Sequence, residues 1–244
     1  MIQCVFWILY IYICDFYLIF EIFDDSVIQF ILLFFCVYHQ ICAIRNFYYC
    51  IYISSAVSSI PKSELEKKFW LRTTSCKKCG IIRPIRSHHC SICDICIIKL
   101  DHHCFLLNNC IGKKNYKFFF SYLFLSFLNS VIALILGIYQ FYLFKKKEME
   151  KMANIQFIEL NFRFIFNFPI KVILLLFICI PVLIGSLYLL IYHLFLMYKG
   201  QTTLERKYPQ LYIEDNNKKN NSLCYKFSKM IESNNWLNIY WLDK

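Results

Sequence analysis

The stretch CKKCGIIRPIRSHHCSICDICIIKLDHHCFLLNNC, residues 76–110, is the most informative part of this sequence. It holds seven cysteines and four histidines, which makes eleven potential metal ligands within thirty-five residues. Two tetrahedral zinc ions would use eight of these side chains and leave three over. The stretch therefore predicts two zinc sites and three further residues whose role must come from other arguments.

Three pairs of cysteines in this stretch are separated by two residues. At this spacing a tight turn can direct two thiolates at one metal ion. The cysteines of these pairs are Cys76, Cys79, Cys90, Cys93 and Cys96, and the side chains that can complete the coordination are His89, His103 and Cys110. The spacing alone does not show which cysteine is left without a metal.

Cys104 is a candidate nucleophile because it belongs to no such pair and directly follows Asp101, His102 and His103. A histidine beside a cysteine can hold the sulfur as a thiolate, and a carboxylate can fix the tautomer of that histidine. The residues alone leave an alternative open, in which Cys104 is a ligand and Cys110 is free.

The composition predicts a membrane protein. Apolar residues make up 59% of the 244 residues and the mean hydropathy is +0.46, which is high for a soluble domain. Four segments approach the length of about 20 apolar residues that a membrane-spanning helix needs, namely residues 5–23, 27–44, 118–144 and 169–198. The first segment lacks a basic start and a small-residue cleavage site, so we do not expect a removable signal peptide.

The basic residues predict the orientation of these helices. Residues 46–117 hold twelve Lys or Arg and the tail from Lys199 holds eight, whereas residues 145–168 hold five. Because cytosolic segments carry the excess of basic residues, the loop, the tail and both termini are expected in the cytosol. Reducing conditions there favour metal binding or catalysis over disulfides. The predicted order is helices 1 and 2 in residues 1–45, a cytosolic loop in 46–117 with a Cys-rich core in 76–119, helices 3 and 4 in 118–198 with a lumenal loop in 145–168, and a cytosolic tail in 199–244.

The spacing of the stretch and of the residues after it resembles that of a known family. The run is Cys76-x2-Cys79-x3-Arg83-Pro84-x-Arg86-x2-His89-Cys90-x2-Cys93-x2-Cys96-x4-Asp101-His102-His103-Cys104-x5-Cys110-x4-Asn115-x3-Phe119. It resembles the Cys-rich domain of the DHHC protein S-acyltransferases, or palmitoyltransferases. A second element of that family, Thr-Thr-x-Glu after the last membrane helix, has its counterpart in residues 202–205, where Thr202, Thr203 and Glu205 stand.

The resemblance implies a fold, a chemistry and a role for each of these residues. The implied fold is an α-helical polytopic membrane protein with four transmembrane helices and a cytosolic two-zinc domain between helices 2 and 3. Cys104 would be the acylated nucleophile, activated by His102 and Asp101, and Thr203 would contact the region of Asp101. The implied ligands are Cys76, Cys79, His89 and Cys96 for the first zinc, and Cys90, Cys93, His103 and Cys110 for the second.

The resemblance also implies the substrates. The acyl donor would be a long-chain acyl-CoA such as palmitoyl-CoA, and the acceptors would be cysteines of membrane-associated proteins. We expect the lipid bilayer as a partner, no nucleic acid, and a location in the Golgi, the endoplasmic reticulum or the plasma membrane. Basic residues near the Cys-rich stretch could bind the phosphates of CoA or anionic lipid headgroups, namely Arg83, Arg86, Lys113, Lys114 and Lys117.

Two departures from the family pattern concern activity more than fold. Phe105 and Leu106 stand where the family usually has Pro-Trp after the nucleophile, and the usual Asp-Pro-Gly after the second helix is absent. An inactive, membrane-anchored zinc-binding scaffold is therefore the main alternative to an enzyme, although a scaffold would not need Asp101, His102 and Cys104 together. A metal transporter is disfavoured, because candidate ligands within the helices are few and scattered.

Overall fold

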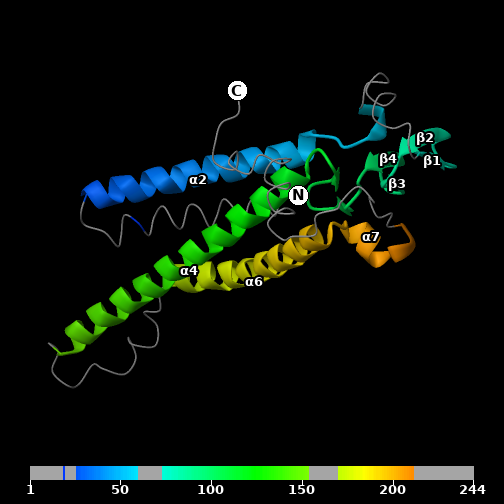
Figure 1. Cartoon of the computed structure of the whole chain (residues 1–244). Helices are drawn as coiled ribbons and strands as arrows, with labels where there is room; N and C mark the ends of the chain where they lie inside the picture. The colour runs from blue at the N-terminus through cyan, green and yellow to red at the C-terminus, as the bar shows by residue number, and fades with distance from the viewer. Residues whose placement is uncertain (1–18, 20–25, 60–72, 154–169, 212–244) are drawn as a thin grey trace. The chain divides into compact units, whose positions relative to one another are not determined.

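The computed structural model describes residues 19, 26–59, 73–153 and 170–211 (Figure 1). Three long helices dominate it, which are α2 (Ser26–Tyr52), α4 (Tyr116–Ala153) and α6 (Ile170–Lys199). Each begins within two residues of a segment that the sequence predicts to span the membrane. Helices α2 and α4 extend about eight residues beyond the predicted ends, because a helix can continue past the apolar stretch that crosses the bilayer.

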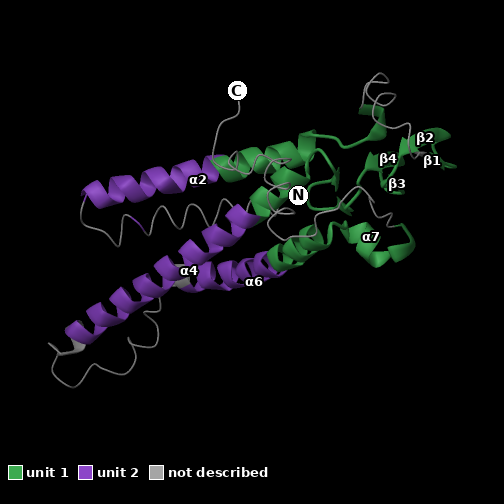
Figure 2. Cartoon of the chain, in the orientation of Figure 1, with its two compact units in different colours: residues 1, 42–123, 189–244 green, residues 2–41, 124–188 purple. Residues whose placement is uncertain are grey.

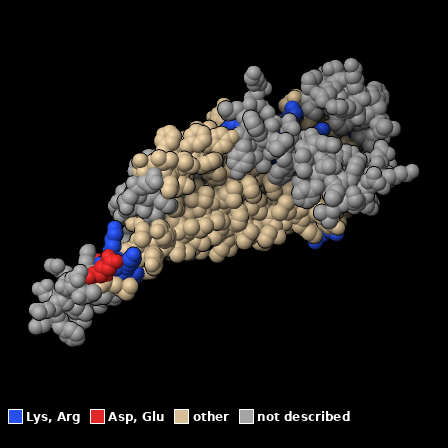
Figure 3. All heavy atoms as spheres, turned by 60° about the vertical axis from the view of Figure 1, so that its left-hand side comes forward, with Lys and Arg blue, Asp and Glu red and all other residues tan. Residues whose placement is uncertain are grey.

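The three long helices have the properties of membrane spans. The candidate spans are Ser26–Tyr52, Tyr116–Glu150 and Ile173–Lys199, with hydropathies of 2.1, 2.1 and 2.8. Large apolar side chains point outward from them, and a broad area of the described surface carries no charged side chain (Figure 3). Such a surface is stable in lipid and costly in water. The first predicted span, residues 5–23, lies outside the described residues apart from Ile19, so the described part of the chain supports three spans and not the fourth.

The Cys-rich stretch forms three antiparallel β-hairpins in succession. The first pairs β1 (Thr73–Cys76) with β2 (Ile81–Pro84), the second pairs β3 (Ser87–Cys90) with β4 (Ile95–Ile98), and the third pairs β5 (His102–Cys104) with β6 (Asn109–Ile111). Each hairpin is too small to bury a core of its own. Their stability must therefore come from the groups they share with one another.

The segment after α6 is short and tightly capped. Gly200, with φ +67°, follows the last residue of α6, and α7 (Thr203–Lys207) begins three residues later and is followed by η2 (Pro209–Leu211). The Thr202 side chain accepts a hydrogen bond from the Glu205 N–H, while the Glu205 carboxylate accepts one from the Thr202 N–H. This reciprocal capping stabilises a helix of only five residues.

The chain divides into two compact units (Figure 2). One unit comprises residues 42–123 and 189–244, with residue 1, and holds the three hairpins and α7. The other comprises residues 2–41 and 124–188 and holds most of the apolar helical length. Within this second unit Ala133, Leu175 and Cys179 form a buried cluster between α4 and α6.

Two asparagines of the first unit join the end of α2 to the third hairpin. Asn109 Nδ2 donates to the carbonyl oxygens of Cys50 and Ile51 at 2.9 and 3.0 Å, and Asn115 Nδ2 donates to that of Ile53 at 3.0 Å. The last carbonyls of a helix have no partner within the helix. These amides satisfy them, so the third hairpin is fixed at the end of a predicted membrane span.

Gly112 allows the closest approach in this region. A Cβ atom there would lie 2.8 Å from Ile97 Cγ2, 2.8 Å from the Ile98 carbonyl oxygen and 2.9 Å from Ser55 Cβ. No side chain fits at these distances. Glycine is required because the second and third hairpins and the segment after α2 meet at this point.

Candidate metal centres and a Cys–His–Asp site

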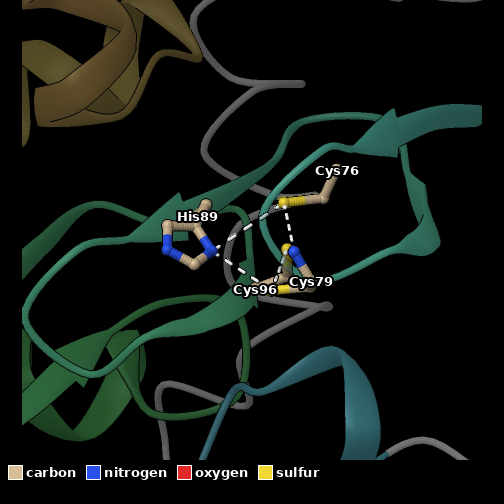
Figure 4. A group of neighbouring side chains, drawn as sticks. All are labelled: Cys76, Cys79, His89 and Cys96. Atoms are coloured by element: carbon tan, nitrogen blue, oxygen red, sulfur yellow. Dashed lines mark hydrogen bonds between the residues drawn. The ribbon is translucent and has the colours of Figure 1, made fainter.

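Four ligand side chains from the first two hairpins converge at one point (Figure 4). The residues are Cys76, Cys79, His89 and Cys96, and their ligand atoms all lie within 4.8 Å of one another. His89 Nδ1 is 3.2 Å from Cys79 Sγ and 3.8 Å from Cys76 Sγ, and Cys96 Sγ is 3.6 Å from Cys79 Sγ. On the other side of the His89 ring, Nε2 lies 3.3 Å from Asp94 Oδ1.

The second and third hairpins form an equivalent group. It consists of Cys90, Cys93, His103 and Cys110. His103 Nδ1 lies 3.8, 3.3 and 3.6 Å from the Sγ atoms of Cys90, Cys93 and Cys110, and the Sγ atoms of Cys93 and Cys110 are 3.5 Å apart. Both groups therefore offer three sulfurs and one imidazole nitrogen.

These spacings fit tetrahedral zinc. Zn–S bonds of about 2.3 Å and Zn–N bonds of about 2.0 Å at tetrahedral angles place the donors roughly 3.5 to 3.8 Å apart. Most of the observed separations lie close to that range, and Cys₃His is a common structural zinc set. Each group could hold one metal ion. Because all four positions would be filled by protein, such an ion would bind the hairpins to one another and would have no open position for water.

The buried Asp101 forms a pair with the half-buried His102 beside the second metal group. His102 Nδ1 lies 2.7 Å from Asp101 Oδ2, and the Asp101 side chain is 1% exposed while that of His102 is 28% exposed. Burial would raise the pKa of Asp101, but the hydrogen bond and charge of His102, the charge of His193 and the Thr203 N–H outweigh it and lower that pKa. The carboxylate therefore stays ionised and fixes one edge of the imidazole.

Cys104 belongs to neither metal group and interacts with His102. Burial would raise the pKa of the Cys104 thiol, but the hydrogen bond to His102 and the backbone N–H groups of Leu107 and Leu106 lower it overall. Burial would lower the pKa of His102, but its hydrogen bonds to Asp101 and Cys104 raise it to about 9. Both shifts favour a thiolate next to an imidazolium, and a thiolate is the form of cysteine that can act as a nucleophile.

The Thr-Thr-x-Glu segment lies against Asp101. The Thr203 N–H donates to Asp101 Oδ1 at 2.9 Å, the Thr203 hydroxyl donates to Asp101 Oδ2 at 2.7 Å, and the Leu204 N–H donates to the Asp101 carbonyl oxygen at 3.2 Å. Asp101 thus receives hydrogen bonds from His102 and from α7 at the same time. The start of α7 helps to orient the carboxylate that orients the imidazole.

Glu205 anchors α7 through an ion pair with Arg86. Arg86 Nε and Nη2 lie 2.7 and 2.6 Å from the two Glu205 carboxylate oxygens, and Nη2 also donates to the Gly200 carbonyl oxygen at 2.9 Å. The Glu205 side chain is 0% exposed. The structure therefore places Arg86, which the sequence suggests for CoA phosphates, in a buried structural pair.

The other residues suggested for phosphate binding have different surroundings. Arg83 Nε donates to the Thr74 hydroxyl at 3.1 Å on the exposed face of the first hairpin. Lys114 Nζ donates to the Ser59 carbonyl and hydroxyl oxygens at 3.3 and 3.0 Å, and Lys113 is exposed. Arg83 lies on β2, whereas Lys113 and Lys114 lie between β6 and α4.

Sequence reasoning missed His193, which lies close to this site. It is 3% exposed, its Nδ1 is 2.9 Å from the Tyr116 hydroxyl oxygen, and its ring centroid is 6.2 Å from that of His102. The Phe119 ring packs edge-on against both imidazoles at 5.2 and 5.1 Å. A single histidine on an apolar helix gives no spacing signal, and its place becomes visible only when the ends of α4 and α6 are brought together.

Two Cys₃His groups, a separate Cys–His–Asp arrangement and three helices apolar enough to cross a membrane define a class of integral membrane protein with a cysteine-rich domain. Comparison with protein families is more specific. The model of the DHHC palmitoyltransferase family matches residues 71–209, which is more than half of the chain. The protein therefore belongs to the DHHC palmitoyltransferase family. A search of curated proteins gives no match.

Proposed function

We propose that this protein is a protein S-acyltransferase that moves a long-chain acyl group from acyl-CoA to cysteines of membrane-associated proteins through an acyl-Cys104 intermediate. The observation that carries the proposal is that Cys104 lies outside both metal groups and stands two residues after His102 on strand β5, where alternate side chains share a face, and Asp101 orients the His102 imidazole. The same three residues carry the catalytic chemistry in the family to which the chain belongs.

The first half of the reaction would acylate the enzyme. Because His102 Nδ1 is hydrogen-bonded to the Asp101 carboxylate, His102 Nε2 is the nitrogen that would take the proton from the Cys104 thiol. The thiolate attacks the carbonyl carbon of the acyl-CoA thioester, the bond to the CoA sulfur breaks, and the CoA thiolate takes the proton from His102. The acyl group is then bound to Cys104 as a thioester.

The second half would transfer the group to a protein. The acceptor cysteine gives its proton to His102, its sulfur attacks the thioester, and Cys104 leaves as a thiolate that recovers the proton. Each half exchanges one thioester for another, so no oxidant and no net energy source is required. This is covalent catalysis with a two-step exchange.

The two metal groups support this reaction without taking part in it. Zinc in Cys76, Cys79, His89 and Cys96, and in Cys90, Cys93, His103 and Cys110, would fix the hairpins relative to one another. His103 lies between His102 and Cys104, so the second metal holds the backbone on which the proposed catalytic residues stand.

The topology forms part of the proposal. Four membrane spans with the Cys-rich domain, the tail and both termini in the cytosol would place Cys104 near the membrane boundary, as the bonds from Asn109 to the end of α2 support. Burial of each methylene in hydrocarbon contributes about 0.8 kcal/mol, so the acyl chain would lie among the helices. Arg83, Lys113 and Lys114 remain as candidates for CoA phosphates, and the membrane is expected to be that of the Golgi, the endoplasmic reticulum or the cell surface.

The experiment is a test for an acyl-enzyme. Purified protein is incubated with an alkyne-tagged palmitoyl-CoA, and the label is compared between wild type and Cys104→Ser before and after neutral hydroxylamine. We expect a label that is absent in the variant and released by hydroxylamine, as a thioester is. Wild-type protein that contains two zinc ions and takes no label would favour the inactive zinc-binding scaffold instead.

A further inference from the structure

The three hairpins are three copies of one 14-residue pattern. Cys76, Cys90 and Cys104 lie 14 residues apart, and each ends the first strand of its hairpin. Each is paired across the hairpin with the residue five positions later, as Cys76 is with Ile81, Cys90 with Ile95 and Cys104 with Asn109. The last residue of each turn also has a positive φ. These residues are Gly80 at 65°, Asp94 at 53° and Asn108 at 48°.

The first two hairpins use this turn to bind metal. In each, the cysteine at the end of the strand and a second cysteine three residues later form half of a metal group. The other half is a histidine and a cysteine from the next hairpin, at the same positions of the next copy. The pairs from the turns are Cys76 with Cys79 and Cys90 with Cys93, and the pairs from the following hairpin are His89 with Cys96 and His103 with Cys110.

In the third hairpin the pattern is interrupted at one position. Leu107 stands where Cys79 and Cys93 stand in the earlier copies, and it is 1% exposed. It packs in a cluster with Ile111 and Phe119, and Cys104 packs against the same cluster. A fourth hairpin does not follow, because α4 begins at Tyr116. Cys104 therefore has the position of a metal ligand without the partner thiol that would make a metal site.

The shared turn geometry brings a backbone N–H to the strand-end sulfur. In the first hairpin the Cys79 N–H donates to the Cys76 sulfur at 3.5 Å. Because the second and third turns have the same register and the same positive φ at their last residue, we expect the N–H groups of Cys93 and Leu107 to face the sulfurs of Cys90 and Cys104 in the same way. Such amides stabilise negative charge on sulfur, which a zinc-bound thiolate and an attacking thiolate both carry.

We propose that the third hairpin is a metal-binding turn converted to catalysis, in which the turn amides hold the Cys104 sulfur and Leu107 keeps metal ions away from it. The turn provides the sulfur with a fixed position beside backbone N–H groups whether or not a metal is present. The inference rests on the proposed role of Cys104 as nucleophile, and it makes Leu107 a residue that determines what the thiolate can bind. Because the turn acts through its backbone, the inference requires no particular side chain at Phe105 or Leu106.

The substitution Leu107→Cys tests this directly. It completes the two-residue spacing, so the introduced thiol, Cys104 and His102 would offer three ligands to a thiophilic cation such as Zn²⁺ or Cd²⁺. The measured quantity is the rate at which iodoacetamide alkylates Cys104. The reaction is run with a phosphine reductant, and peptide mass spectrometry gives the extent of alkylation at each time. Free metal at ten times its dissociation constant should slow alkylation about tenfold, and a chelator too weak to remove the two structural zinc ions should reverse this.

Leu106→Cys is the matched control. It adds a thiol to the same turn at a position that the earlier hairpins do not use for metal. We expect its alkylation rate to change less than about twofold at the same metal concentration. Equal metal sensitivity in the two variants would overturn the proposal, because any added thiol would then suffice. Lack of metal protection in a folded Leu107→Cys variant would overturn it as well.

A second measurement covers the case in which Leu107→Cys does not fold. Wild-type protein selectively labelled with ¹⁵N-leucine should show amide resonances of Leu106 and Leu107 that shift when Cys104 is replaced by alanine. Resonances that stay in place would show that the turn amides do not bind the sulfur. Neither measurement depends on acyl transfer, so failure of wild type to form an acyl-enzyme would refute the proposed function without being mistaken for failure of this inference.

Discussion

The substitution Arg86→Met is predicted to release α7 from the Cys-rich domain. The Arg86 and Glu205 side chains are 12% and 0% exposed and share two hydrogen bonds of 2.7 and 2.6 Å. Removing one partner of a buried ion pair costs about 3–5 kcal/mol, because the other charge remains buried without a counter-ion. The direct bonds of α7 to Asp101 are two from Thr203 and one from Leu204, each contributing about 1–3 kcal/mol.

The Arg86–Glu205 ion pair and the hydrogen bonds from α7 to Asp101 contribute free energies of similar size. Loss of the ion pair should therefore shift α7 strongly toward an undocked state. A cost of about 3 kcal/mol corresponds to roughly a hundredfold change in population, since 1.4 kcal/mol corresponds to tenfold. Hydrogen–deuterium exchange should show protection of the Thr203 and Leu204 amides reduced by about that factor. Acyl-enzyme formation should fall with it, because Asp101 loses the hydrogen bonds from Thr203.

Two variants serve as controls for this prediction. Arg83→Met removes a similar charge three residues earlier, on β2. Arg83 donates only to the exposed Thr74 hydroxyl among the described hydrogen bonds, so this variant should leave exchange in α7 unchanged. The double variant Arg86→Met with Glu205→Gln removes both buried charges and should recover part of the protection. Unchanged exchange in Arg86→Met, or a double variant less protected than the single one, would refute the reasoning.

Three further predictions concern other parts of the same unit. Gly112→Ala should destabilise the fold by about 1–3 kcal/mol through overpacking and so lower the melting temperature measured by calorimetry. An unchanged melting temperature would show that the contact around Gly112 can accept a methyl group. Tyr116→Phe removes the hydroxyl that is hydrogen-bonded to His193. It should lower the maximal rate of acyl-enzyme formation and leave the acyl-CoA concentration for half-maximal rate nearly unchanged. A change in that concentration alone would contradict a positioning role. The pKa of the Cys104 thiol is lowered, so its thiolate should persist to lower pH than that of an ordinary cysteine. The pH profile of Cys104 alkylation should therefore move to higher pH in His102→Ala. A profile that stays in place would exclude His102 as the activating group.

Much of the site could be predicted because it depends on spacing within one short stretch. The two-residue gaps indicated zinc, and the family resemblance gave the ligand sets that the structure brings together at the two metal groups. The resemblance also anticipated the contact between Thr203 and Asp101, which spacing could not have shown across about a hundred residues. The family match to residues 71–209 confirms the resemblance itself.

The remaining features depend on contacts between segments far apart in the chain. From the sequence alone, Arg86 is a candidate for phosphate binding. Only the fold shows that its guanidinium forms an ion pair with Glu205. Asn109 gives no sign that its amide completes the end of α2, and His193 gives no sign that it lies beside His102. The 14-residue pattern is different, because it is visible in the sequence, but its meaning for Leu107 becomes clear only when the hairpin registers are known.

The central claim is that Cys104 carries the acyl group, and the most direct measurement is peptide mass spectrometry after brief incubation with palmitoyl-CoA. We expect one palmitoyl group on Cys104, release of one CoA thiol for each group bound, and loss of the group when an acceptor thiol is added. Acylation that occurs on other cysteines and persists in Cys104→Ser would contradict the account. So would protein that retains both zinc ions and leaves Cys104 unmodified.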